Sequence, residues 1–151
     1  MKRIRLGASD LESSRLVYGC MRIAGDGSAA ARERGRAALR AALEAGFNHF
    51  DHADLYGSGA CEALFGEWLR EEPGLREELI ITSKCGIRLP DDPETGDPKR
   101  YDFSFEHIVR SVEGSLERLG IDRIAAPAID QAPTWMHRRS KWRPDATPTS
   151  P

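Results

Sequence analysis

The sequence predicts an α/β fold in which short strands alternate with amphipathic helices. Apolar residues repeat at helical spacing over residues 28–45, 61–69 and 104–119. Short runs of strand-forming residues lie between these helices at 48–51 and 79–83. The order strand, helix, strand is typical of parallel βαβ units, which close into a barrel or stay open as a doubly wound sheet. In either case, function is expected at the carboxyl ends of the strands.

The N-terminal half of the sequence predicts the first elements of this fold. Two short extended runs, KRIRLG and SRLVYG, flank the polar segment ASDLES, which is typical of a β-hairpin or of a turn that leads into a first strand at 16–18. The helix at 28–45 places Leu39 and Ala42 on one face, and Gly46 follows it, as a helix stop requires. Residues 48–51 then fit a second strand.

The later elements follow from the same reasoning. The helix at 61–69 has an apolar side, and LIITS at 79–83 is a third strand of strong β type. After a long loop at 85–103, Ser104 can cap a helix that Gly120 ends. The apolar residues that repeat along this helix are Phe105, Ile108, Val109, Val112, Leu116 and Leu119. The segment IDRIA begins a fourth strand.

Composition narrows the class of protein. The 151 residues are 40% hydrophobic, which is typical of one globular domain, and a net charge of -2 gives no basic field to hold nucleic acid or an anionic membrane. MKRIRLGASD lacks the apolar run of a signal peptide and no window approaches a membrane span, so we expect a cytoplasmic protein. Cys20, Cys61 and Cys85 form no CxxC pair, which favours reduced thiols packed in the core over a disulfide or a zinc site.

The stretch FNHFDHADLYG, at 47–57, concentrates the residues that carry chemistry. On a strand, His49 and Asp51 share one face, while Phe50 and His52 share the other. A metal-assisted hydrolase could use His49 and Asp51 as ligands, but the pattern supplies no further ligand, so no metal site is predicted.

An acid/base site fits the same stretch better. A tyrosine, with a reference pKa of about 10, becomes a useful proton donor near neutral pH only where a nearby cation favours its phenolate. Lys84, at the end of the third strand, can supply that cation to Tyr56, and Asp51 can orient the ammonium. The alternative is a salt bridge at the rim of a barrel beside an exposed tyrosine.

These residues and their surroundings resemble the active-site framework of the aldo-keto reductase family. That framework is a glycine with an aromatic residue, a strand ending in Asp, an Ala, a Tyr, and a downstream Glu with a Gly four residues later. It is met at Gly46, Phe47, Asp51, Ala53, Tyr56, Glu62 and Gly66. Lys84 stands where the family lysine ends the third strand, whereas Asn48 and His52 depart from the usual residues. The resemblance covers Met1 to about Ile124.

The resemblance implies a fold, a reaction and a cofactor. It implies the N-terminal half of a (β/α)8 TIM barrel with a β-hairpin beneath it, ending after about strand four. It also implies reduction of small aldehydes or ketones by NADPH, with Tyr56 as general acid, Lys84 lowering the pKa of Tyr56, and Asp51 anchoring Lys84. Cys20 and Met21 match positions under the nicotinamide, with Asp51 beside them, although core packing explains Cys20 and Met21 equally well.

The sequence departs from the family after residue 124. Ala125 replaces an acidic residue, Pro127 falls inside the expected fourth strand, and Asp130 occupies the position of the family's catalytic histidine. His137 stands too late to take that role. Proline argues against a normal strand here, so residues 1–124 are predicted as a partial barrel and 125–151 as a disordered tail rich in proline and arginine, such as an out-of-frame translation would give.

Two classes of function therefore stay open. One is an aldo-keto reductase represented by a half that is inactive alone, because the half that holds the NADPH phosphates and adenine in relatives is missing. The other is a non-catalytic half-barrel that binds a partner chain or self-associates through its exposed sheet edges. The altered loops leave the substrate open, although the long loop at 85–103 is placed to contact it.

Overall fold

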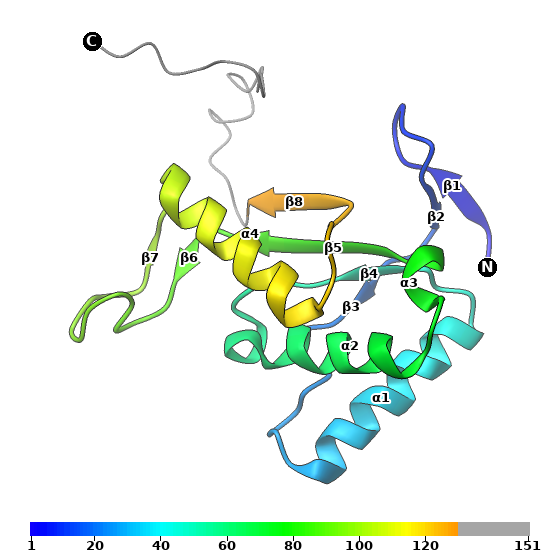
Figure 1. The fold of residues 1–151 in the computed structure, drawn as a ribbon, viewed down its shortest axis with the longest axis horizontal. Helices are drawn as coiled ribbons and strands as arrows, with labels where there is room; N and C mark the ends of the chain where they lie inside the picture. The colour runs from blue at the N-terminus through cyan, green and yellow to red at the C-terminus, as the bar shows by residue number, and fades with distance from the viewer. Residues whose placement is uncertain (130–151) are drawn as a thin grey trace.

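A computed structural model describes residues 1–129 of the chain, with the backbone alone described at 126–129. Strands β1 (Arg3–Arg5) and β2 (Glu12–Ser14) form an antiparallel hairpin. Four strands then form a parallel sheet in the order β3-β4-β5-β8. Their bounds are β3 (Tyr18–Gly19), β4 (His49–Asp51), β5 (Ile80–Cys85) and β8 (Ala126–Ile129). The hairpin lies at the amino ends of these strands (Figure 1).

Helices connect the strands as expected of βαβ units. They are α1 (Ala29–Glu44), α2 (Ala60–Glu71), the short α3 (Leu75–Glu78) and α4 (Phe105–Leu119). A 3-10 helix, η1 (Tyr56–Gly59), precedes α2, and a second hairpin of β6 (Ile87–Arg88) and β7 (Arg100–Tyr101) follows β5. This second hairpin lies at the carboxyl ends of the strands (Figure 1). The sheet stays open, so the described residues form part of a barrel that is not closed.

The boundaries of α4 confirm the cap predicted at Ser104, whose hydroxyl accepts from the His107 amide. At the start of α1 the Ser28 hydroxyl accepts from the Ala31 amide, a cap that was not predicted. Gly120 takes a left-handed φ of 67° directly after α4, where a side chain would be strained.

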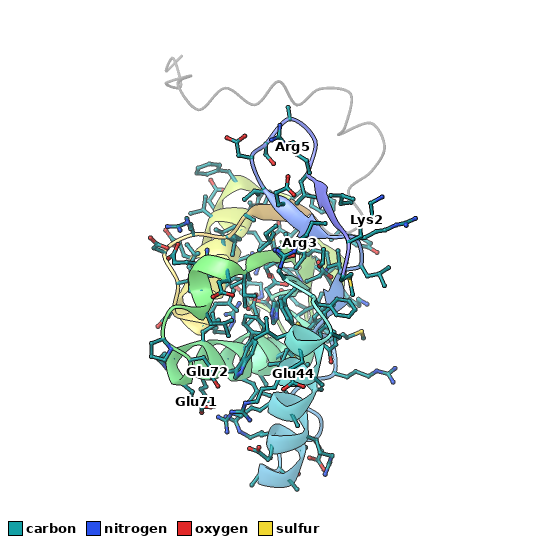
Figure 2. All side chains as sticks on the ribbon, turned by 90° about the vertical axis from the view of Figure 1, so that its right-hand side faces the viewer. Lys2, Arg3, Arg5, Glu44, Glu71 and Glu72 are labelled. Atoms are coloured by element: carbon teal, nitrogen blue, oxygen red, sulfur yellow. The ribbon has the colours of Figure 1, made fainter. Side chains whose placement is uncertain are left out.

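The core lies between the sheet and the helices α1 and α2. Phe50 of β4 packs against Phe65 and Trp68 of α2, with ring centroids 5.3 and 6.0 Å away, and all three side chains are fully buried. At the end of α2, Glu71 and Glu72 lie on the surface that faces the viewer in Figure 2. Arg40 of α1 pairs with both of them. Burial of aromatic surface is therefore what attaches α2 to the sheet.

Several predicted boundaries are wrong. The hairpin's second strand is Glu12–Ser14 rather than the run SRLVYG, and the first parallel strand is Tyr18–Gly19 rather than 16–18. The loop at 85–103 contains the hairpin of β6 and β7.

The apolar stripe of α4 is only half-buried, and Phe105 is 74% exposed. The exposed part of the stripe lies at the amino-terminal end of the helix, whereas Leu119, at the carboxyl end, is fully buried in the core.

The expectation that Pro127 argues against a normal fourth strand is also wrong, because β8 pairs with β5 in a parallel ladder. The fourth strand begins at Ala126, later than the segment IDRIA, and Pro127 stands in register with Ser83 of β5. Within residues 1–129 this strand lies at the edge of the sheet, where a residue that cannot donate a ladder hydrogen bond is tolerated. Asp130, His137 and most of the tail predicted to be disordered lie outside the described residues.

Candidate active site

Three side chains predicted to form the site converge at the carboxyl rim of the sheet. Lys84 Nζ donates to Asp51 Oδ2 over 2.6 Å and to the His52 carbonyl over 2.7 Å. The same ammonium lies over the ring of Tyr56, 5.0 Å from its centroid. Asp51 ends β4, Lys84 lies near the end of β5, and Tyr56 begins η1. The rim thus brings a carboxylate, an ammonium and a phenol into one cluster.

The cluster keeps Lys84 charged. Burial lowers the pKa of Lys84, but the hydrogen bond and charge of Asp51, followed by the contact with Tyr56, outweigh it, so the pKa lies above its usual value. The Lys84 side chain is 19% exposed and that of Asp51 is 33% exposed. An ammonium held in this way is a fixed positive charge beside the phenol across the neutral pH range.

The alternation of side chains along β5 fixes the direction of Lys84. Thr82 and Lys84 both contact Asp51, on the face of the sheet that turns away from α2. Ser83 points the other way, where its hydroxyl donates to Glu62 of α2 over 2.6 Å. A shift of one residue in register would send Lys84 toward the helices and break the cluster.

The turn after β4 places Tyr56. The Tyr56 amide donates to the Ala53 carbonyl over 3.1 Å, and the next residue, Gly57, has a φ of 58°. Such a left-handed backbone is readily adopted by glycine. The chain can therefore reverse directly behind the tyrosine and bring its ring over Lys84.

The two histidines of the motif lie on opposite faces of β4, as predicted. His49 lies on the face of Asp51: its Nδ1 is 2.9 Å from Ser13 Oγ, and its Nε2 is 3.3 Å from Thr82 Oγ1. His52 is fully buried, with its ring centroid 4.6 Å from that of Phe65. Among residues 1–129 no three His, Cys, Asp or Glu side chains are grouped so as to hold a metal ion.

The two residues expected to contact a cofactor differ in exposure. Cys20 is fully buried in the core, and burial, reinforced by the charge of Asp51, raises the pKa of its thiol above the usual range. The Cys20 amide donates to the Asp51 carbonyl over 2.9 Å. Met21, the next residue, is 56% exposed. Of the pair, only Met21 offers its side chain to a ligand at the rim.

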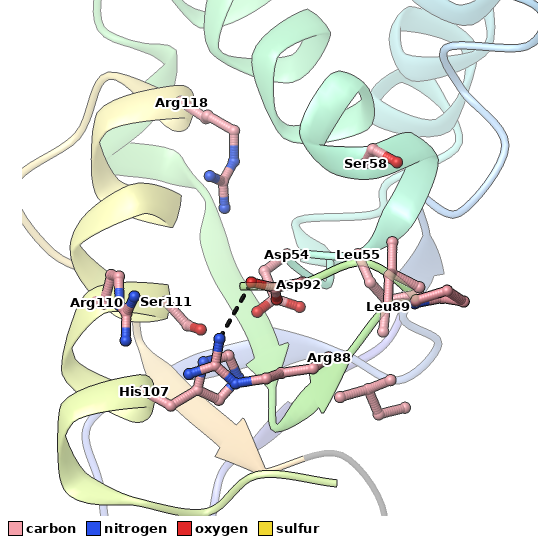
Figure 3. Close-up of a pocket in the computed structure, with 12 residues that line it drawn as sticks. Asp54, Leu55, Ser58, Arg88, Leu89, Asp92, His107, Arg110, Ser111 and Arg118 are labelled. Carbon is pink, nitrogen blue, oxygen red and sulfur yellow. Dashed lines mark hydrogen bonds and ion pairs between the residues drawn. The ribbon is translucent and has the colours of Figure 1, made fainter. Parts of the chain in front are cut away.

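A pocket of about 440 Å³ lies beside the cluster but does not contain it. Asp54, Arg88 and His107 line it together with α4 residues, and Arg88 crosses it to pair with Asp92 over 3.1 Å (Figure 3). Asp51, Tyr56 and Lys84 are not among its lining residues. The pocket is therefore a feature that neighbours the cluster.

Two structural networks support the site, and neither was assigned from the sequence. Asn48 accepts the Ser14 amide over 2.6 Å and donates to the Glu12 carbonyl over 2.9 Å, which joins the first hairpin to β4. Glu62, fully buried, binds Arg118 of α4 over 2.8 Å. Asn48 and Glu62 both lie within the stretch that resembles the aldo-keto reductase framework, and their place in that stretch was the signal by which the sequence could have indicated their structural role.

No described helix is long and apolar enough to cross a membrane.

Comparison with known proteins identifies the family. The model of the aldo/keto reductase family matches residues 15–137. The chain belongs to this family. The matched range continues past Ile124, and the domain boundary proposed there stays a prediction.

Curated relatives match with similar coverage. The chain is 40% identical over 125 residues to 6-dehydroglucose reductase of Agrobacterium fabrum, covering 82% of this chain and 41% of that protein. It is 37% identical over 124 residues to oxidoreductase YdhF of Escherichia coli, covering 82% and 41%. The chain thus spans about two fifths of the length of these aldo/keto reductase relatives.

Solved structures agree on the fold. The holo form of aldo-keto reductase AKR11C1 from Bacillus halodurans superposes with a TM-score of 0.71 at 34% identity, covering 85% of this chain and 40% of that one. Glycerol dehydrogenase AKR11B4 from Gluconobacter oxydans superposes with a TM-score of 0.73 at 29% identity, covering 85% and 38%. The described residues therefore form a partial TIM barrel of the aldo/keto reductase type.

Proposed function

We propose that Asp51, Tyr56 and Lys84 form the proton-donating site of a carbonyl reductase that uses NADPH. The observation that carries this proposal is the position of the Lys84 ammonium, 2.6 Å from the Asp51 carboxylate and 5.0 Å from the ring centroid of Tyr56. A carbonyl oxygen gains negative charge as it is reduced, and a positioned acid that protonates it contributes roughly 10²- to 10⁴-fold in rate.

Each of the three residues has a role in that proton transfer. Tyr56 gives its hydroxyl proton to the carbonyl oxygen and becomes a phenolate. Lys84 stabilises the phenolate because its charge is already fixed beside the ring. Asp51 holds the ammonium in place and keeps the cluster neutral before the reaction. The substrate class that fits this chemistry is a small aldehyde or ketone.

The rim also fits the nicotinamide end of the cofactor. Met21, which follows β3 on the same rim, exposes 56% of its surface and offers an apolar contact, and Asp51 keeps a third of its side chain exposed. Cys20 is buried, so its contribution would come from its backbone. Bound NADPH would supply the hydride. The groups that hold its phosphates are proposed to lie in the part of the relatives that this chain does not span.

A second candidate function is self-association without catalysis. Within residues 1–129, β3 and β8 are the edges of an open sheet, and Leu16 and Val17 before β3 are 59% and 47% exposed. Unpaired edges and exposed apolar side chains are templates for pairing with a second chain. Sedimentation over a range of concentrations tests it: a monomer at all concentrations would refute this candidate.

A hybrid enzyme tests the proposed reaction directly. Residues 1–124 of this chain would replace the matching segment of 6-dehydroglucose reductase from Agrobacterium fabrum, which is 40% identical over that region. We expect the hybrid to oxidise NADPH with aldehydes, and we expect Lys84→Met to lower kcat by about 100-fold. As a matched control, Lys2→Met, at an exposed lysine directly before β1 in the first hairpin, should leave kcat unchanged. A folded, active hybrid in which Lys84→Met has no effect would refute the proposal.

A further inference from the structure

A continuous row of hydrogen-bonded side chains connects the first hairpin to the proposed site. It begins at Ser13 Oγ, 2.9 Å from His49 Nδ1, and continues from His49 Nε2 to Thr82 Oγ1 over 3.3 Å. Thr82 Oγ1 is in turn 3.3 Å from Asp51 Oδ1. The other oxygen of the Asp51 carboxylate, Oδ2, accepts a hydrogen bond from Lys84. The row thus runs along the face of β4 and β5 that carries the site, from the amino ends of the strands to their carboxyl ends.

The Thr82 hydroxyl has a single hydrogen, which it donates to Asp51 Oδ1 over 3.3 Å. Its oxygen lies 3.3 Å from His49 Nε2 and can accept from that nitrogen when the ring carries its hydrogen there. The Ser13 hydroxyl also has a single hydrogen and two acceptors within reach, the Ser14 carbonyl and His49 Nδ1, both 2.9 Å away. The row therefore permits either tautomer of His49, and the contact between Thr82 and Asp51 is the part of the row that orients the carboxylate.

Burial raises the cost of losing a hydrogen bond in this row. Ser13 is 1% exposed and His49 is 8% exposed, so neither can readily replace a lost partner with water. Thr82 touches the carboxylate at Oδ1 and leaves Oδ2 for Lys84, which fixes the rotation of the carboxylate. Without the Thr82 hydroxyl, the carboxylate could rotate and its pairing with Lys84 would loosen.

We propose that Thr82 and His49 are positioning residues, which hold the Asp51 carboxylate in the orientation that receives Lys84. This inference rests on the proposed function for its catalytic consequence, but its structural content does not depend on activity. Neither residue touches the ammonium or the phenol in the described contacts. Their effect on Lys84 passes through Asp51.

Side-chain NMR on the full 151-residue chain tests the positioning role without any assay of activity. We expect Thr82→Val to lower the pH at which Lys84 titrates by about half a unit, because the ion pair loosens. Thr82→Ser keeps the hydroxyl and should restore the titration of Lys84. His49→Phe should act like Thr82→Val, although more weakly.

A control variant and a measurement of kcat and KM complete the test. His107→Phe replaces a buried histidine of α4 outside the row and should leave the titration of Lys84 unchanged. In the hybrid enzyme, Thr82→Val should lower kcat by roughly tenfold with little change in KM, and Thr82→Ser should recover most of it. Identical Lys84 titration in Thr82→Val and Thr82→Ser would overturn the inference. An inactive hybrid with the expected NMR result would count against the proposed function alone.

Discussion

Removing the positive partner of Glu62 should destabilise the chain strongly. Glu62 is fully buried in α2, where its carboxylate accepts from Arg118 Nε over 2.8 Å and from Ser83 Oγ over 2.6 Å. The change Arg118→Met keeps much of the side chain's apolar length but removes its charge. The carboxylate is then left in the interior without a compensating cation.

The magnitude follows from the distance. Two unit charges 2.8 Å apart attract with about 6 kcal/mol at an effective dielectric constant of about 20. Part of this attraction is offset because both charges lose hydration when the pair is buried. Removing one partner of a buried pair typically costs about 3 to 5 kcal/mol in the free energy of unfolding. Arg118 is a third exposed, so the lower end applies, and we expect a loss of about 3 kcal/mol in the free energy of unfolding.

Urea unfolding followed by circular dichroism measures this loss. The double variant Arg118→Met with Glu62→Gln carries no buried charge and keeps an acceptor for Ser83, so it should lose only about 1 kcal/mol. The control Arg110→Met lies on the same helix and has no ion pair among the described residues, and it should be neutral. A loss below about 0.5 kcal/mol for Arg118→Met, or a double variant less stable than the single one, would refute the reasoning.

Three further predictions concern packing, pH and activity. Gly66→Ala should cost about 2 kcal/mol in urea unfolding, because a Cβ would lie 2.5 Å from the Arg118 carbonyl oxygen, whereas a Cβ at Gly19 meets nothing within 4 Å and Gly19→Ala should be neutral. The free energy of unfolding should fall as the pH is lowered from 6.5 to 5, by up to about 1.4 kcal/mol per pH unit. Burial, helped by the charge of Lys84, lowers the pKa of His52 to about 3, so in this range only the unfolded chain binds a proton at His52. The same dependence of stability on pH in the His52→Phe variant would contradict this. The 151-residue chain alone should oxidise NADPH with aldehydes no faster than its Tyr56→Phe variant, because cofactor positioning can contribute roughly 7 to 11 kcal/mol; clear turnover by a monomer above that variant would show the reasoning to be wrong.

The sequence was sufficient for those parts of the structure that depend on local pattern. Ser104 and Gly120 mark the ends of α4 as predicted, because capping depends on neighbouring residues alone. Side chains alternate along a strand, so the assignment of a third strand is enough to put Thr82 and Lys84 on one face, where both contact Asp51. The convergence of Asp51, Tyr56 and Lys84 was therefore predictable once parallel strands were assumed.

The features that sequence reasoning missed depend on contacts between distant segments. Asn48 was read as a small departure from the family, yet its side chain bonds to Ser14 and Glu12 of the hairpin. The row through His49 needs the first hairpin, β4 and β5 in register, and no local pattern reports that register. Pro127 was judged by its intrinsic preference, whereas its place at the edge of the described sheet decides whether it is tolerated.

The most direct test of the proposed site is the effect of Tyr56→Phe on kcat in the hybrid enzyme. The change removes only the hydroxyl that is proposed to protonate the carbonyl oxygen. The control Tyr18→Phe removes a hydroxyl from a tyrosine of β3 that packs against Phe47 and Phe50. We predict that Tyr56→Phe lowers kcat by at least about 100-fold, with NADPH binding retained, and that Tyr18→Phe changes it less than about threefold. Equal kcat values for Tyr56→Phe and the unaltered hybrid would contradict the assignment of Tyr56 as the acid.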